Sequence, residues 1–105
     1  MKNLNDIATE TYNTAIKRGK FVPSDDVSQR HRYTHDGILD ELKEYAIASE
    51  ERKSVHIPEY SEAEEELIDI MICCLTALRE RNVDVDKILK DKVEFNKTRD
   101  EAGIK

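Results

Sequence analysis

The protein has 105 residues, of which 38% are hydrophobic and another 38% are charged, with only three glycines and two prolines. A chain of this length is expected to form one domain over residues 1–105 with a modest core, and such charged, Gly-poor chains are usually helical and often complete their cores by oligomerising. The formal net charge of −6 argues against a general nucleic-acid binder, which needs a cationic surface to displace counterions from phosphates.

Insertion into a membrane is not expected either. The longest apolar run, Ile70–Leu75, is far shorter than the roughly 20 residues that a membrane-spanning helix needs. The first residues of the chain also lack the apolar region of a signal peptide. We therefore expect a soluble, cytoplasmic protein.

The first predicted helix covers about Leu4–Arg18, where apolar residues recur at helical spacing. Gly19 stands where a C-terminal cap belongs. The following residues, 21–26, are expected to form a loop.

A second helix is clearest over Gly37–Glu51 and begins somewhere between Ser28 and Thr34. Glu41 and Glu44 lie beside its expected inner face. That face consists of Ile38, Leu42, Tyr45 and Ala46. A linker over residues 53–60 follows, in which a proline blocks continuation of the helix.

The third predicted helix, Glu62–Arg81, starts with a capping box formed by Ser61 and Glu64. At about 100° per residue, its apolar side chains cover roughly 220° of the circumference, whereas an ordinary surface helix needs only about 100°. We therefore expect cover on two sides, by its own domain and by another subunit. The remaining strip carries Glu66 and Asp69, and the adjacent Cys73 and Cys74 are expected to be reduced core or interface residues.

The fourth predicted helix begins near Asp84 and runs to about Arg99. Its inner stripe starts with Val85, Ile88 and Leu89. Extended along the same line, the stripe becomes cationic and polar at Lys92, Asn96 and Arg99. The tail, residues 100–105, is expected to be loosely held.

Two pairs of acids, Glu41 with Glu44 and Glu66 with Asp69, have a spacing that places both carboxylates of a pair on one side of a helix. Such carboxylates are the ligands that Mg²⁺ prefers. Without a cation, they would repel one another by about 3 kcal/mol per pair at about 5 Å. If the two helices face each other, the chain holds a site for divalent cations, and the cationic line of the fourth helix suits the phosphates of a nucleoside triphosphate.

These elements together resemble the MazG-like all-α nucleoside triphosphate pyrophosphohydrolases. The resemblance rests on Asp40–Glu44, which matches E-x-x-E, on Glu65–Asp69, which matches E-x-x-D, and on Lys92–Arg99, which matches K-x-x-x-N-x-x-R. Two less specific segments, Ala15–Gly19 and Ile57–Ser61, are also similar to the family. The resemblance thus touches most of the chain.

The resemblance implies a four-helix, MazG-type fold that assembles as a homodimer or homotetramer. Glu41, Glu44, Glu66 and Asp69 would bind Mg²⁺ and carry the catalysis. The downstream element would contact the phosphates or close the site through Lys92, Asn96 and Arg99. The implied reaction is hydrolysis between the α and β phosphates of a ribo- or deoxyribonucleoside triphosphate, which gives the monophosphate and pyrophosphate.

The chain departs from the family at two places. Cys73 stands where many members have Tyr or Arg, and Asp100, Glu101 and Ala102 stand where the family has Pro and His. These changes leave the metal ligands intact and affect base preference and closure over the substrate. The alternatives are a helical oligomer that binds nucleotide or metal in a regulatory role without turnover, and a structural interaction module that does not respond to Mg²⁺.

Overall fold

The computed structural model of the protein describes the backbone of residues 2–102 and the side chains of residues 2–99. Over this range the fold is all-α, as predicted. It consists of four helices and an isolated antiparallel bridge between Lys53 and Ser61. The helices are α1 (Leu4–Lys17), α2 (Val27–Ile47), α3 (Glu62–Glu80) and α4 (Val85–Ala102). No helix in the described part of the chain is long and apolar enough to cross a membrane.

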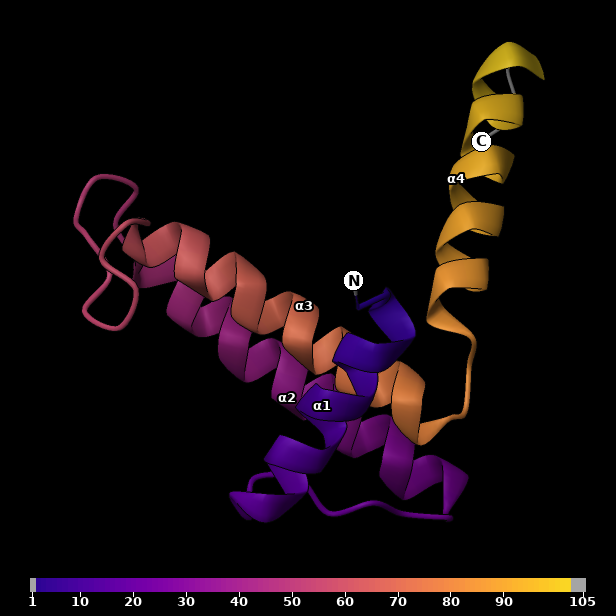
Figure 1. Cartoon of the computed structure of the whole chain (residues 1–105), viewed down its shortest axis with the longest axis horizontal. Helices are drawn as coiled ribbons and strands as arrows, with labels where there is room; N and C mark the ends of the chain where they lie inside the picture. The colour runs from indigo at the N-terminus through magenta and orange to yellow at the C-terminus, as the bar shows by residue number, and fades with distance from the viewer. Residues whose placement is uncertain (1, 103–105) are drawn as a thin grey trace.

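The helices α2 and α3 lie side by side as a long antiparallel pair, α1 crosses α3, and α4 points away from the other three (Figure 1). The ends of α1 and α3 are set by local hydrogen bonds that the sequence predicted. At the end of α1, Gly19 has φ 71°, and the amides of Gly19 and Lys20 donate to the carbonyls of Ile16 and Ala15, which is a Schellman motif. At the start of α3, Ser61 and Glu64 form the expected capping box.

The second helix differs from the prediction at both ends. It starts at Val27, capped by Asp26, and it ends at Ile47 rather than Glu51. The chain leaves the helix there because the amide of Ser49 donates to Glu62 Oε1 (3.1 Å), while Ser49 Oγ accepts from the amides of Glu51 and Arg52. These contacts replace another helical turn with a tight bend.

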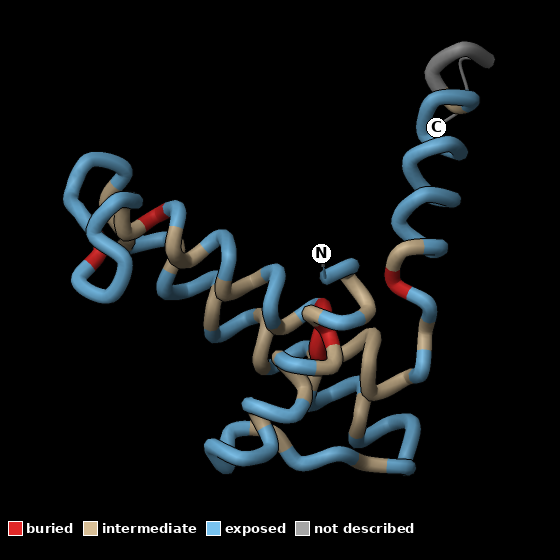
Figure 2. Tube along the Cα trace, viewed as in Figure 1, coloured by how far each residue is buried: buried red, intermediate tan, exposed pale blue. Residues whose placement is uncertain are grey.

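A small apolar core forms where α1 crosses α3 and meets the start of α4 (Figure 2). Ala8, Leu75 and Val85 are buried there, at 0%, 8% and 4% exposure. Leu4, Ile7 and Leu78 pack against them. Among the described residues no large side chain is fully buried, so one chain encloses very little apolar volume.

The first turn of α4 is fixed to α1 by reciprocal capping. The Asp86 carboxylate accepts from the amides of Leu4 and Asn5 (3.2 and 3.3 Å), and Asn5 Oδ1 accepts from the amide of Val85 (2.7 Å). Asn5 Nδ2 also donates to Asp84 (2.9 Å). These bonds satisfy amides that a helix N-terminus leaves free, and they fix where α4 leaves the core.

From Lys87 to Thr98, α4 is exposed (Figure 2). The predicted inner stripe is therefore wrong past Val85, because Ile88 and Leu89 are 45% and 51% exposed. The helix also continues through residues 100–102, which were predicted to belong to a loose tail. The rest of that tail, residues 103–105, lies outside the described residues.

Candidate functional site

Acidic side chains meet between α2 and α3. Glu41 from α2 and Glu66 and Asp69 from α3 each place a carboxylate oxygen so that all three atoms lie within 4.8 Å of one another. All three residues are half-buried. The structure thus brings together three of the four acids that the sequence singled out, and we call these three residues the acid cluster.

The acid cluster lies on the side of each helix that faces its neighbour. The expected inner face of α2 is partly wrong, since Leu42 is 48% exposed and Ala46 is also exposed, whereas Glu41 is half-buried. On α3, the polar strip that contains Glu66 and Asp69 faces inward. The cluster is held inside the helix pair while apolar side chains point outward.

Glu44 lies at the edge of the cluster. It is exposed, and it lines two open pockets, one shared with Glu41 and Asp69 and the other shared with Glu66. Its negative charge contributes to the raised pKa values of the three clustered acids. Glu44 is therefore near enough to act on a ligand at the cluster while it remains open to water.

Burial and mutual repulsion make the cluster hard to ionise. Burial raises the pKa of Glu66 to about 7, and the charges of Asp69, Glu44 and Glu41 add to the effect. Burial is also the main cause of the raised pKa of Glu41 and of Asp69, followed by the charges of Glu44 and Glu65 respectively. A bound cation would offset both causes, because it stabilises the ionised carboxylates.

Two buried oxygens of the cluster, Glu41 Oε2 and Glu66 Oε2, have no hydrogen-bond partner. A buried carboxylate oxygen without a partner is costly unless a proton or a metal ion satisfies it. The three residues offer oxygen ligands only, which is the donor set of Mg²⁺ and Ca²⁺ rather than of zinc. The donor set and the unpaired atoms therefore fit a hard divalent cation.

The larger pocket has a volume of about 1000 Å³ and reaches from the acid cluster to the end of α1. This size is at the upper end of the range for small-molecule sites, about 300–1,000 Å³. Two cations line it, Arg18 and Lys20, together with the aromatic rings of Phe21 and Tyr33. Sequence reasoning missed Arg18, Lys20 and Phe21 as lining residues because they follow α1, where no helical periodicity relates them to the acids.

Cys73 also lines the larger pocket, one turn after Asp69. Its Sγ lies 4.0 Å from the carbonyl oxygen of Gly37. Burial raises the pKa of its thiol to about 11, with a further contribution from the charge of Glu41. The side chain is therefore a neutral thiol at physiological pH, and thiolate chemistry is not expected of it.

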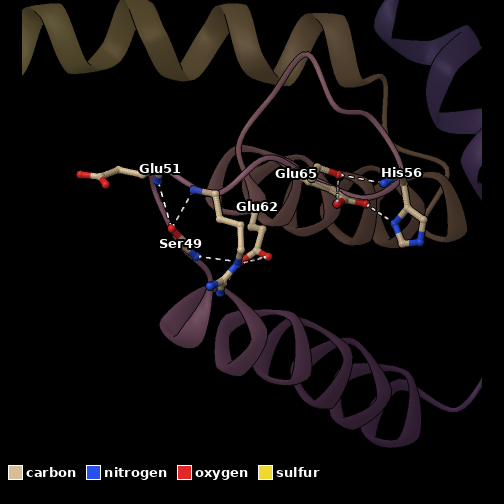
Figure 3. Close-up of polar contacts among 7 residues, drawn as sticks. Ser49, Glu51, His56, Glu62 and Glu65 are labelled. Carbon is tan, nitrogen blue, oxygen red and sulfur yellow. Dashed lines mark hydrogen bonds and ion pairs between the residues drawn. The ribbon is translucent and has the colours of Figure 1, made fainter.

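The loop between α2 and α3 is held against the start of α3 by polar contacts (Figure 3). Arg52 forms two hydrogen bonds to Glu62, at 2.7 and 3.0 Å. Glu65 accepts from the buried Ser54 Oγ (2.5 Å) and contacts His56 Nδ1 (2.8 Å). Acids such as Glu62 and Glu65 are favoured at a helix N-terminus by their charge alone. Here they also fix the loop, beside the smaller pocket, whose lining includes His56.

Lys92, Asn96 and Arg99 are not at the acid cluster. Within the described residues, α4 contacts α1 and α3 but not α2, and neither pocket has an α4 side chain in its lining. Lys92 Nζ and Arg99 Cζ instead lie 4.9 and 5.6 Å from the centre of the exposed Phe95 ring. In one chain, the predicted site residues therefore lie in two separate places.

The comparisons with known proteins identify no relatives. Neither the protein-family models, nor the curated proteins, nor the solved structures gave a match.

Proposed function

We propose that the protein is a Mg²⁺-dependent nucleoside triphosphate pyrophosphohydrolase that works as a homo-oligomer of the MazG-like type. The observation that carries this proposal is the acid cluster, with three carboxylate oxygens within 4.8 Å and two buried oxygens without a partner. The agreement of these acids with the E-x-x-E and E-x-x-D pattern supports the choice of family.

Glu41, Glu66 and Asp69 would hold the metal. When bound, Mg²⁺ supplies positive charge that lowers the pKa of an attacking water and stabilises the phosphate oxygens. Glu44, which is exposed and outside the set of three close oxygens, would accept the proton of that water as a general base.

The larger pocket is lined by six acids and two cations, so a nucleotide would bind there together with metal ions that offset the acids. A nucleoside triphosphate carries about four negative charges and requires cations beyond the metal. Arg18 and Lys20 supply two such cations in the lining of the pocket, and Phe21 and Tyr33 offer apolar rings to a base. The α–β phosphoanhydride would lie at the acid cluster, which gives a nucleoside monophosphate and pyrophosphate as products.

The proposal is tested by measuring pyrophosphate release from ribo- and deoxyribonucleoside triphosphates, with and without Mg²⁺. We expect turnover by the wild type only with Mg²⁺, and a loss of about 100-fold or more in Asp69→Asn. Glu94→Gln is the matched control, because Glu94 is an exposed acid of α4 that pairs with Lys97 outside both pockets.

A second readout does not depend on turnover. Mg²⁺ should raise the melting temperature of the wild type and of Glu94→Gln but not that of Asp69→Asn. Stabilisation without turnover of any nucleotide would favour the regulatory, non-catalytic alternative. No response to Mg²⁺ in either assay would contradict the enzyme and a metal-binding regulator, and it is the result expected of a structural interaction module.

A further inference from the structure

Four acids lie on one side of α3 near its start, in two rows that are one helical turn apart. Glu62 stands four residues before Glu66, and Glu65 stands four residues before Asp69. This spacing places the members of each pair on the same side of the helix. The second row belongs to the acid cluster, whereas the first row contacts the loop between α2 and α3.

The two rows differ in their hydrogen bonds. In the first row, Glu62 accepts from the amide of Ser49 (3.1 Å) and from two nitrogens of Arg52 (2.7 and 3.0 Å) (Figure 3). The bonds from Arg52 and from Ser49 lower the pKa of Glu62. In the second row, Glu66 has a buried oxygen without a partner. The loop therefore satisfies the first row, and the second row keeps an oxygen that a cation can use.

Glu62 connects the residues that follow α2 with the first turn of α3. Ser49 lies two residues after the end of α2, and Glu62 is the first residue of α3. Backbone bonds close the same bend, because the amide of Ala63 donates to the carbonyl of Ser49 (3.0 Å) and the amide of Glu62 donates to that of Arg52 (2.9 Å). One carboxylate thus gathers the donors at this end of the helix pair.

Apolar packing does little to fix α2 along α3. The structure describes α2 along its whole length, and none of its residues is buried. Hydrogen bonds join the pair at both ends, from Ser49 to Glu62 at one end and from Arg81 to Thr34 (3.2 Å) at the other. The acid cluster lies between these ends, where like charges repel one another. The polar contacts at the ends must therefore hold the helices together against that repulsion.

A metal site between two helices tolerates little movement of one helix along the other. Mg²⁺ binds oxygens at about 2.0–2.1 Å, so two ligands of one ion lie at most about 4 Å apart. The three oxygens of the acid cluster lie within 4.8 Å of one another, which is close to this limit. A slip of α2 by one residue would move Glu41 by about 1.5 Å along the axis and turn it by about 100°. The site would then lose its ligand from α2.

We propose that Glu62 is a positioning residue that keeps α2 in register with α3, and so keeps Glu41 within reach of a cation held by the acids of α3. The part of this inference that concerns Mg²⁺ rests on the proposed function, whereas the register of the two helices does not. The side chain of Arg52 is 68% exposed, and exposed ion pairs contribute little to stability. Loss of Glu62 should therefore affect the acid cluster more than the fold.

Calorimetric titration with Mg²⁺ tests the inference without turnover. Glu62→Ala should weaken Mg²⁺ binding by about tenfold or more, the effect typical of residues that orient metal ligands. Glu62→Gln keeps an acceptor oxygen and should restore most of the affinity. The matched control is Glu64→Ala, which also removes an acid of the first turn. Glu64 accepts from the amide of Ser61 (2.8 Å), within its own helix cap, so this variant should keep the wild-type affinity.

Spin labels test the register without any metal. In a Cys73→Ser background, one label is placed on the exposed Cys74 of α3 and the other on Lys43→Cys of α2. Excess unlabelled chain restricts the measurement to distances within one molecule. Pulsed electron paramagnetic resonance should give one narrow distance for the wild type, for Glu62→Gln and for Glu64→Ala. The distance should shift or broaden in Glu62→Ala.

A milder variant guards against a failure of Glu62→Ala to fold. Arg52→Ala removes two of the three hydrogen bonds to Glu62, and it should change both readouts in the same direction by a smaller amount. Wild-type Mg²⁺ affinity and label distance in these two variants, or an equal loss in Glu64→Ala, would overturn the inference. A wild type that binds no Mg²⁺, although the label distance still depends on Glu62, would contradict the proposed function alone.

Discussion

The two halves of α3 turn different kinds of side chain inward: apolar side chains in the C-terminal half and acidic side chains in the N-terminal half. In the C-terminal half, Leu75 is buried against Ala8 and Val85, as in an ordinary core. In the N-terminal half, Glu66 and Asp69 face α2 while Leu67, Ile68 and Met71 are about half exposed. The first arrangement stabilises a single chain, whereas the second holds charge inside and leaves apolar surface exposed. One helix thus has a half that forms the core of the chain and a half in which acids are held inward and apolar side chains are exposed.

We expect the largest effect on stability from truncating a side chain of the core. Leu75→Ala removes a side chain that is 8% exposed, and we expect it to lower the free energy of unfolding by about 3 kcal/mol. Met71→Ala, at 51% exposure, should lower the stability of a dissociated chain by much less and should instead weaken association. Chemical denaturation of both variants would measure their stability, and light scattering would measure their association. If both substitutions lowered the free energy of unfolding of the dissociated chain equally, the two halves of α3 would not differ in the way described.

Neutralising one acid of the cluster should lower the activity without lowering the stability. We expect Glu41→Gln to lower pyrophosphate release by about 100-fold, while the metal-free protein keeps or gains stability because one repelling charge is gone. Pyrophosphate release and the melting temperature without metal would be measured on the same samples. A large fall in that melting temperature would instead give Glu41 a structural role.

The raised pKa of Glu66 predicts a specific pH dependence without metal. Below about pH 4.5 the carboxyl is protonated in both the folded and the unfolded chain, so it carries no penalty. As the pH rises to about 7, the unfolded chain ionises while the folded chain retains the proton, and the free energy of unfolding falls. We expect a loss on the order of 2 kcal/mol relative to Glu66→Gln.

Denaturation curves of the wild type and Glu66→Gln between pH 4 and pH 8 would measure this difference. All other titratable groups are present in both proteins, so their contributions drop out when the two free energies of unfolding are subtracted. Saturating Mg²⁺ at pH 7.5 should restore the stability of the wild type but not that of the variant. A difference between the two proteins that does not change with pH would show that Glu66 ionises normally.

The smallest effect is expected at the start of α3. Ser61→Ala removes the oxygen that accepts from the amide of Glu64 (3.0 Å), and we expect a loss of about 1 kcal/mol in the free energy of unfolding. Ser61→Asp keeps an acceptor and serves as the control. Pyrophosphate release by the alanine variant should change little, since the acid cluster begins a full turn later.

The parts of the fold that depend on neighbouring residues could be predicted from the sequence. The capping box of Ser61 with Glu64 and the glycine cap at Gly19 need only contacts within a few positions. The spacing of each acidic pair likewise fixed which carboxylates share a side of a helix. Helix periodicity therefore predicted the four helices and the three residues of the acid cluster, but it did not separate Glu44 from them.

The remaining features depend on contacts between distant positions. Periodicity finds the apolar side of a helix but does not say what covers it, so Leu42 was assigned to the interior and is half exposed. The end of α2 depends on Glu62, which is 13 residues from Ser49. The direction of α4 depends on Asn5, which is 80 residues from Val85. No pattern of neighbouring residues predicts these three features.

The reciprocal capping of α1 and α4 has a consequence for the behaviour of the protein at low concentration. Because Asn5 and Asp86 fix the first turn of α4 at the start of α1, we expect that an isolated chain of the proposed homo-oligomeric enzyme would keep Lys92, Asn96 and Arg99 away from its own acid cluster. If turnover requires the proposed oligomer and that oligomer is a dimer, the rate of hydrolysis below its dissociation constant would rise with the square of the chain concentration. A newly made or diluted chain would then be unable to consume nucleotides until it met a second one.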